Sequence, residues 1–360
     1  MRTSIAILAL LLLTSSASAK TDPGLKPGKI LHRTSAEHAH PYSLYIPSKY
    51  SRKVSWPVVV SSHGRGGSGK GEIRQWKRFA DEHGFIVACP DMCTATVNRP
   101  PTSRLAPAVE DEQVILSILD ELGRQLRLNP RAVMVTGFSG GGNPSYWTGL
   151  RHPHRFTHIC TRGGNFAPQH IPTDEKILAA GRTRLAIYIY YGEKDHPLIL
   201  GEGGKPGQAV LAHDALKKAG YANVTIEKIA GMKHQSRADI AAGWFGENLV
   251  KNRKAFAAGD KAGALIEKAR ASLEKGRVSA AIRDLQKAEK IETKAELESR
   301  AAKELEAVNA RGAKLLAQAK AAREAGDAPE AKKLLGKILR DYRGLPCATE
   351  ARALQKAWRE

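Results

Sequence analysis

The chain of 360 residues contains little that would fix a fold or a function by itself. Its four cysteines, Cys89, Cys93, Cys160 and Cys347, allow three disulfide connectivities and are too few to define the fold. Cys89 and Cys93 are close enough in sequence to pair, and free buried thiols are an equal alternative. The one long apolar run near the start, residues 5–13, is too short to span a membrane.

Aromatic residues are also scarce, at 6% of the chain, although the net charge is +21. The excess of Lys and Arg divides almost equally between residues 1–250 and 251–360, and the second part offers only Phe256, Tyr342 and Trp358 for stacking. A nucleic-acid site concentrates cations and, for single strands, interleaves aromatics. The sequence therefore predicts no specific nucleic-acid binding and favours attraction to anionic surfaces or polymers.

Metal and phosphate motifs are likewise missing. The histidines of residues 152–158 have no carboxylate or cysteine partner nearby in sequence, which favours a surface cluster over a metal site. The glycines of residues 201–204 lack the lysine and hydroxyl residue that end a phosphate loop, which favours a flexible turn. We expect neither a metal nor a cofactor.

The start of the chain has the pattern of an export signal. Met1 and Arg2 precede the apolar residues 5–13, and small residues follow over 15–19. A charged start, a short apolar centre and small residues before a cleavage point are typical of a secretory signal. We predict cleavage after Ala19 and a secreted or periplasmic protein with no transmembrane segment.

Residues 133–142 carry the most informative motif. An apolar, β-rich run over 132–136 leads into Gly137-Phe138-Ser139-Gly140-Gly141, and a helix is predicted to follow. A strand, a tight turn with serine and a helix present the hydroxyl above a sheet edge, with the Gly140 N–H facing any oxyanion formed there. The pattern also occurs by chance as a glycine-rich turn, but the context favours Ser139 as a nucleophile.

A second loop could complete an oxyanion site. Residues 55–62 form a β-branched run of the kind buried in parallel sheets, and residues 63–67 follow it as His-Gly-Arg-Gly-Gly. An N–H of Gly64 or Arg65 could act together with Gly140. The alternative is a flexible turn that needs glycine only for its backbone angles.

An acid and a base are predicted from their order along the chain. Asp195 follows a predicted strand over 185–191, and His234 follows another over 224–229. An aspartate at such an edge can hold an imidazole in the correct tautomer, so we predict the set Ser139, Asp195 and His234. Glu193 or a plain turn role for Asp195, and a surface position for His234, are the alternatives.

The remaining predicted elements set the walls of a cleft. Helices are predicted over 71–82 and 109–128, the latter stopped by Asn129-Pro130, and the first strand over 42–46. The loops 92–107 and 162–172 follow strand ends, where ligands bind in open α/β sheets. They are candidate substrate-binding walls, although no particular substrate residue can be named.

These motifs carry a resemblance. Residues 129–142 with Glu110-Asp111 and the loop 63–67 resemble the α/β-hydrolases that include polyhydroxybutyrate depolymerases and feruloyl esterases, over about residues 40–250. The resemblance implies an α/β-hydrolase fold with a mostly parallel, eight-stranded sheet, a Ser-His-Asp triad at Ser139, His234 and Asp195, and hydrolysis of esters. No long lid or substrate-binding insertion is recognisable.

Residues 258–360 have the composition of an all-α domain, separate from a catalytic domain over 20–257. A self-match at an offset of 50 pairs two sets, each reading helix, glycine turn, helix, with a further helix over 294–309 between them. The sets are Leu265, Ala269, Gly276, Ala281 and Leu285, and Leu315, Ala319, Gly326, Ala331 and Leu335. The region is similar to tetratricopeptide-type repeats, and we expect it to bind a protein partner. A solvated segment that only extends the chain is the alternative.

Together the motifs predict an exported serine hydrolase that cleaves carboxylic esters through an acyl-enzyme intermediate. The candidate substrates include polymeric and polysaccharide-linked esters. An exported serine peptidase of the same fold could use the same residues. A partner-binding scaffold, with the function in its helical tail, is a further alternative.

Overall fold

The computed structural model describes residues 24–92, 106–294 and 299–358, with the backbone alone for residues 106–109. The chain divides into two compact units, the first ending at Phe245 and the second beginning at Gly246. The predicted export signal, Cys93 and most of the loop 92–107 lie outside the described residues. Cys89, Cys160 and Cys347 are free and buried. Among the described residues, no helix is both long and apolar enough to cross a membrane.

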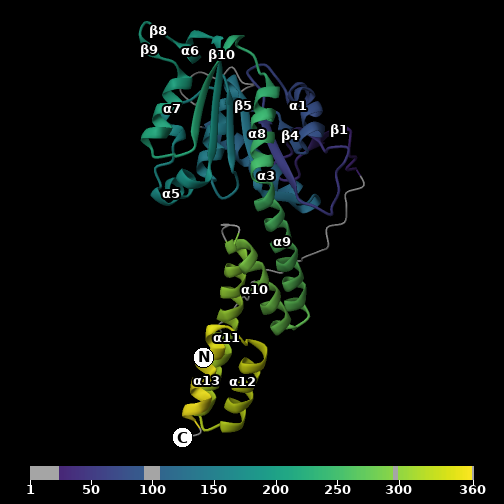
Figure 1. Cartoon of the computed structure of the whole chain (residues 1–360), viewed down its shortest axis with the longest axis vertical. Helices are drawn as coiled ribbons and strands as arrows, with labels where there is room; N and C mark the ends of the chain where they lie inside the picture. Colours follow the sequence, from purple (N-terminus) through teal and green to yellow (C-terminus); the bar gives the residue numbers. More distant parts are fainter. Residues whose placement is uncertain (1–23, 93–105, 295–298, 359–360) are drawn as a thin grey trace, which may run out of the picture. The chain divides into compact units, whose positions relative to one another are not determined.

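The first unit is built on an eight-stranded sheet in the order β1-β2-β4-β3-β5-β6-β7-β10. Figure 1 shows this sheet with helices beside it. β2 pairs antiparallel with both β1 and β4, and the remaining neighbours are parallel. The strands are β1 (Ile30–Thr34), β2 (Pro41–Tyr45), β3 (Trp56–Ser62), β4 (Ile86–Pro90), β5 (Leu128–Phe138), β6 (His158–Arg162), β7 (Ala186–Lys194) and β10 (Val224–Lys233). The sheet is thus eight-stranded and mostly parallel, as the resemblance implied, with antiparallel pairing at β2.

Helices flank this sheet, and apolar side chains fill the space between. The helices are α1 (Gly69–His83), α3 (Ala106–Gln125), α4 (Gly142–Arg151), α5 (Glu175–Arg184), α6 (Pro197–Leu200), α7 (Gln208–Lys218) and α8 (Ala238–Lys251). The β-branched residues Val58, Val59 and Val60 are fully buried in β3, because a strand covered on both faces has no solvent side. A short hairpin of β8 (Gly201–Glu202) and β9 (Lys205–Pro206) turns at two left-handed glycines.

Two boundaries differ from the sequence prediction. Asn129 and Pro130 do not stop a helix next to the nucleophile strand, since α3 already ends at Gln125 and both residues belong to β5. The pairing of β3 with β5 shifts register between Trp56 and Val58. Pro57 of β3 and Pro130 of β5 lie at this irregularity, and neither has an N–H to donate to a ladder. β1 was not predicted at all.

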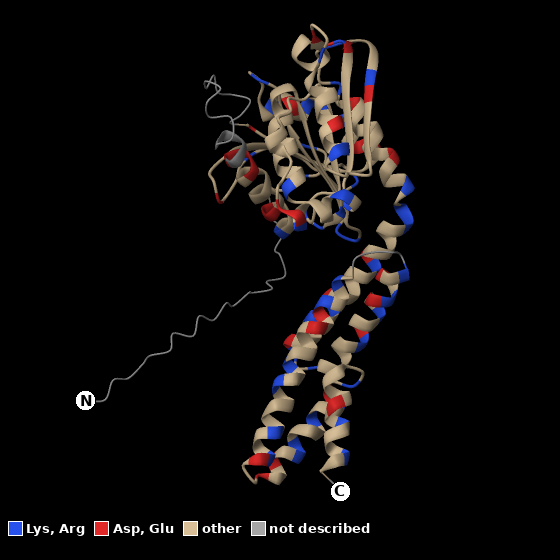
Figure 2. Cartoon of the chain, turned by 90° about the vertical axis from the view of Figure 1, so that its left-hand side faces the viewer, with Lys and Arg blue, Asp and Glu red and all other residues tan. Residues whose placement is uncertain are grey.

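The second unit consists of helices, of which two hairpins repeat along the chain. They are α9 (Arg253–Glu274), α10 (Val278–Lys294), α11 (Arg300–Glu324), α12 (Ala328–Asp341) and α13 (Pro346–Ala357). The hairpins α9–α10 and α11–α12 turn at Gly276 (φ 68°) and Gly326 (φ 83°), and the paired positions of the self-match have the same burial. The separate helix predicted over 294–309 is wrong, because α11 runs unbroken through Asn309. Figure 2 shows acidic and basic residues interspersed along these helices.

The same backbone bonds end both first helices of the repeat. After α9, the N–H of Gly276 donates to the carbonyl of Leu273 at 3.0 Å and the N–H of Arg277 to that of Ser272 at 2.8 Å. After α11, the N–H groups of residues 326 and 327 donate to the carbonyls of residues 323 and 322 at 3.1 and 2.8 Å. This left-handed glycine cap satisfies the last carbonyls of a helix. The same pair of cap hydrogen bonds therefore recurs after 50 residues, as the sequence pattern does.

A histidine is buried at the start of β6. His158 is 5% exposed, its ring meets Trp244 and Phe245 edge-on at centroid distances of 5.4 and 5.0 Å, and its Nδ1 lies 2.8 Å from the Thr157 hydroxyl. Burial among these rings lowers the pKa of His158 to about 4, because an imidazolium would lose its hydration there.

We predict that His158 destabilises the fold in acid. Its pKa is lower in the folded than in the unfolded state, so the stability present above about pH 6.5 falls as the pH drops toward 4, by about 2 kcal/mol at pH 5. The free energy of unfolding, measured with urea, should differ less between pH 7.5 and pH 5 for His158→Phe than for the wild type. His213→Gln, which changes a half-buried histidine of α7, should leave the difference unchanged. An equal loss in His158→Phe and the wild type would contradict the prediction.

The helical unit offers a matched pair of glycines. A Cβ on Gly312 in α11 would lie 2.4 Å from Cys347 Sγ and 2.8 Å from the ring of Tyr342, whereas one on Gly336 in α12 would meet nothing within 4 Å. We expect Gly312→Ala to destabilise this unit by about 1–3 kcal/mol through overpacking. Gly336→Ala should stabilise it by about 0.5–1 kcal/mol through helix propensity. Thermal unfolding followed by circular dichroism measures both, and equal effects would refute the packing described.

Candidate active site

The three residues predicted to act together all follow strand ends. β5 ends at Phe138, β7 at Lys194 and β10 at Lys233, directly before Ser139, Asp195 and His234. These strands run parallel within the order β5-β6-β7-β10, so their carboxyl ends meet at one edge of the sheet. Ligands bind at this edge in open α/β sheets.

Ser139 lies on a strained turn. Its φ is +51°, a left-handed conformation that costs a residue other than glycine about 1–2 kcal/mol. A short 3₁₀ turn over Ser139–Gly141 connects β5 to α4, and the N–H of Asn165 donates to the Ser139 carbonyl at 2.8 Å. A Cβ on Gly137 would lie 1.9 Å from the Gly141 carbonyl oxygen, so the turn closes only with glycine there.

The loop after β3 packs directly on this turn. A Cβ on Gly141 would lie 2.6 Å from the carbonyl oxygens of Ser62 and His63, and one on Gly64 would lie 2.8 Å from Cδ1 of Phe138. The two segments predicted to supply oxyanion donors, the turn with Gly140 and the loop with Gly64, are therefore neighbours. Gly140 is buried, and Arg65 is exposed at the outer side of the loop.

The His63 side chain holds this loop from inside. It is 2% exposed; its Nε2 accepts a hydrogen bond from the N–H of Met92 at 3.0 Å, and its Nδ1 donates to the Gly64 carbonyl at 2.8 Å. One ring nitrogen accepts and the other donates, which is the pattern of a neutral imidazole. His63 thus ties the loop to the residue that follows Asp91 at the end of β4.

Asp195 and His234 form a short hydrogen bond. His234 Nδ1 donates to Asp195 Oδ1 at 2.5 Å, and the Asp195 side chain is almost fully buried. The N–H groups of Gly192 and His196 donate to the same carboxylate at 3.0 and 2.7 Å. Burial raises the pKa of Asp195, but the hydrogen bonds from His234 and the two backbone groups lower it further, so the pKa lies below its ordinary value. The carboxylate is charged at neutral pH.

Glu193, the alternative acid, takes a different partner. Its Oε2 accepts a hydrogen bond from the N–H of Gly231 at 2.9 Å, in the irregular part of β10. Because β7 extends through Lys194, Glu193 is a strand residue, and Asp195 is the first residue beyond the strand. The geometry therefore pairs Asp195, and not Glu193, with the imidazole.

The serine turn and the acid–base pair meet through neighbouring residues. The ring of Phe138, directly before Ser139, lies on the His234 ring with centroids 4.7 Å apart. A Cβ on Gly163 would lie 3.0 Å from Asp195 Oδ2 and 3.4 Å from His234 Nδ1, so this glycine leaves the space that the pair needs. Gly163 was not predicted, and its only sequence signal is a glycine pair at a strand end.

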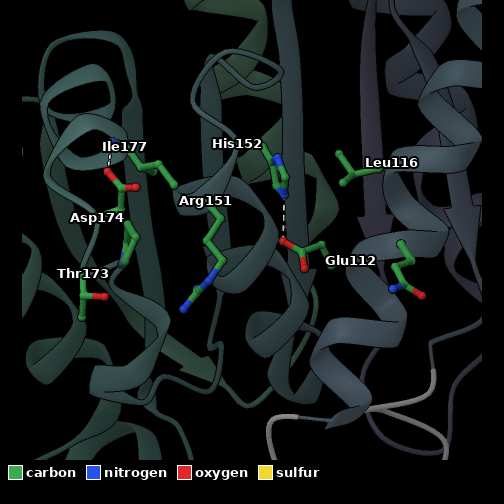
Figure 3. Close-up of a pocket in the computed structure, with 9 residues that line it drawn as sticks. Glu112, Leu116, Arg151, His152, Thr173, Asp174 and Ile177 are labelled. Atoms are coloured by element: carbon green, nitrogen blue, oxygen red, sulfur yellow. Dashed lines mark hydrogen bonds and ion pairs between the residues drawn. The ribbon is translucent and has the colours of Figure 1, made fainter.

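A cavity of about 400 Å³ lies at the other end of α4 (Figure 3). Its lining includes Arg151, the last residue of α4, and His152. A helix of ten residues is about 15 Å long, so α4 separates this cavity from the turn that carries Ser139. His152 Nε2 lies 2.8 Å from Glu112 Oε1, so a carboxylate forty residues away partners a histidine that seemed to lack one. Among the described residues, no cluster of three or more histidine, cysteine or acidic side chains could hold a metal.

Hydrolases that use a nucleophilic serine combine a serine on a strained turn with a histidine that is hydrogen-bonded to a buried carboxylate. The family comparison agrees with this class. Residues 34–302 match the model of the Esterase family, described as "Putative esterase", and the chain therefore belongs to this family. The match begins in β1 and continues beyond the first unit. No curated protein matches the chain.

Several solved structures are similar to part of this chain. One is the S-formylglutathione hydrolase FrmB of Staphylococcus aureus, with 16% identity, 61% of this chain and 95% of that chain covered, and a TM-score of 0.47. Another is the ferulic acid esterase AmCE1/Fae1A of Anaeromyces mucronatus in complex with ferulic acid, with 15% identity, 63% and 92% covered, and a TM-score of 0.47.

The strain at Ser139 is measurable. We predict that Ser139→Gly is more stable than Ser139→Ala by up to about 1 kcal/mol, because only glycine adopts φ +51° without a steric penalty, and this gain exceeds its larger entropy loss on folding. Urea unfolding of the two variants gives the difference. At Ser145, which lies within α4, the same exchange should favour alanine. If Ser139→Gly is less stable than Ser139→Ala, by the margin found at Ser145, the turn is unstrained.

Proposed function

We propose that the protein is an exported serine hydrolase that cleaves carboxylic esters with Ser139 as nucleophile, His234 as base and Asp195 as the acid that orients it. The observation that carries the proposal is the 2.5 Å hydrogen bond between His234 Nδ1 and a buried Asp195, with the residue before Ser139 packed on the same imidazole. Membership of the Esterase family supports ester substrates. The pattern of residues 1–19 supports export.

The reaction would proceed in two steps. His234 Nε2 takes the proton from Ser139 Oγ, which attacks the ester carbonyl carbon, and Asp195 stabilises the imidazolium that forms. The oxyanion would receive hydrogen bonds from the N–H of Gly140 and from an N–H of Gly64 or Arg65. His234 then protonates the departing alcohol. Water, deprotonated by the same imidazole, attacks the acyl-enzyme. The acid leaves, and His234 returns the proton to Ser139 Oγ.

For the helical unit we propose a role in binding a protein partner. The repeated hairpins α9–α10 and α11–α12 support it, since stacked hairpins expose extended surfaces to solvent. The substrate proposal stays general: an ester, with polymeric and polysaccharide-linked esters as candidates, in accord with the net charge of +21 and its attraction to anionic polymers.

We predict that a fluorophosphonate probe labels the wild type and not Ser139→Ala. Ser139→Ala should also lose the hydrolysis of p-nitrophenyl acetate. Asp195→Asn should lower kcat by about 10⁴-fold, because the imidazole loses the carboxylate that orients it. Glu193→Gln is the matched control at the end of the same strand and should stay close to wild type. The assignment is wrong if Ser139→Ala labels as well as the wild type, or if Glu193→Gln loses more activity than Asp195→Asn. p-Nitroanilides, as amide counterparts, separate an esterase from a peptidase.

A further inference from the structure

Arg162, the last residue of β6, is fully buried. A guanidinium tolerates such a position only with strong partners. Its Nη2 donates to Oε1 of Glu72 in α1 at 2.6 Å, and Glu72 is 3% exposed. Burial lowers the pKa of Arg162, but the charge of Glu72 raises it further; burial raises the pKa of Glu72, but Arg162 lowers it further. The two side chains therefore form a charged pair inside the protein.

This pair connects two segments of the candidate active site. Arg162 Nη2 also donates to the Ser61 hydroxyl at 2.9 Å and to the Ser62 carbonyl at 3.3 Å, at the end of β3 and directly before His63. Its Nη1 donates to the hydroxyl of Ser236, two residues after His234. One buried side chain thus contacts both the strand that carries the oxyanion loop and the segment that carries the base.

The segment after His234 needs such support. Arg237 has a left-handed φ of +39°, which costs about 1–2 kcal/mol for a residue with a Cβ. Tyr190 holds the same segment from β7, since its hydroxyl lies 3.0 Å from the Ser236 carbonyl oxygen and 2.5 Å from that of Arg237. Hydrogen bonds from two strands therefore keep a strained backbone in place directly behind the histidine.

We propose that Arg162, held by Glu72, is a positioning residue for His234 and acts through the Ser236 hydroxyl. Asp195 fixes one nitrogen of the imidazole, and the backbone that Arg162 anchors sets where the other nitrogen points relative to Ser139. The proposal rests on the proposed function of Ser139, Asp195 and His234. Loss of the hydrogen bond between Arg162 and the Ser236 hydroxyl should impair proton transfer and leave substrate binding intact, so kcat falls while KM does not change.

Ser236 allows a test that leaves the buried ion pair intact. Ser236→Ala removes the hydroxyl that Arg162 contacts and should lower kcat for p-nitrophenyl acetate on the order of 10²-fold, the loss expected from a displaced catalytic group. Ser236→Thr keeps the hydroxyl and should restore kcat. Ser117→Ala, which removes a buried hydroxyl bonded to the Val114 carbonyl within α3, controls for a general loss of stability. Wild-type kcat in Ser236→Ala, or an equal loss in Ser117→Ala, overturns the proposal.

A second readout does not depend on turnover. The ring signals of His234 in ¹H–¹⁵N spectra, assigned by their loss in His234→Gln, should move and broaden in Ser236→Ala and stay near the wild type in Ser236→Thr and Ser117→Ala. If the wild type has no turnover that depends on Ser139, the proposed function fails, and these signals still test the positioning role. Unchanged ring signals in Ser236→Ala refute it.

Discussion

The close approach of two backbone segments is the constraint on which the candidate site depends. Gly137 and Gly141 leave no space for a Cβ, because the turn around Ser139 closes on itself and lies against the carbonyls of residues 62 and 63. This closure imposes the left-handed backbone of Ser139. The serine and the two candidate oxyanion segments are thus placed by backbone packing, which side-chain rotation cannot disturb. Only the acid and the base come from elsewhere in the sheet.

Much of this site could be predicted from the sequence because its residues follow buried strands. Apolar β-branched runs identify the strands, and parallel strands bring their ends to one edge, so Asp195 and His234 were expected near each other. The contact between His234 Nδ1 and Asp195 Oδ1 agrees with that expectation. The roles of these residues with Ser139 in catalysis stay a prediction, since esterase family membership gives the class of reaction and not the residues.

Other features could not be predicted, because they depend on contacts between distant residues or on the backbone alone. Arg162 and Glu72 are 90 residues apart, and no local pattern reveals that a strand-end arginine is buried beside a helix glutamate. β7 and β10 extend to Lys194 and Lys233, beyond their apolar stretches, because the two strands pair again at these residues after an irregularity between Ile229 and Lys233. β1 was missed because it is a polar edge strand defined by its pairing with β2.

The repeated cap at Gly276 and Gly326 gives the second unit a modular length. Each hairpin has its own glycine turn, and small residues and a leucine at matching positions along its helices have the same burial. Gain or loss of one fifty-residue segment would change the size of this unit by a whole hairpin without requiring a new core. The length of the helical unit is therefore set by the number of hairpins, whereas the sheet edge that carries the candidate site depends on single residues at fixed positions.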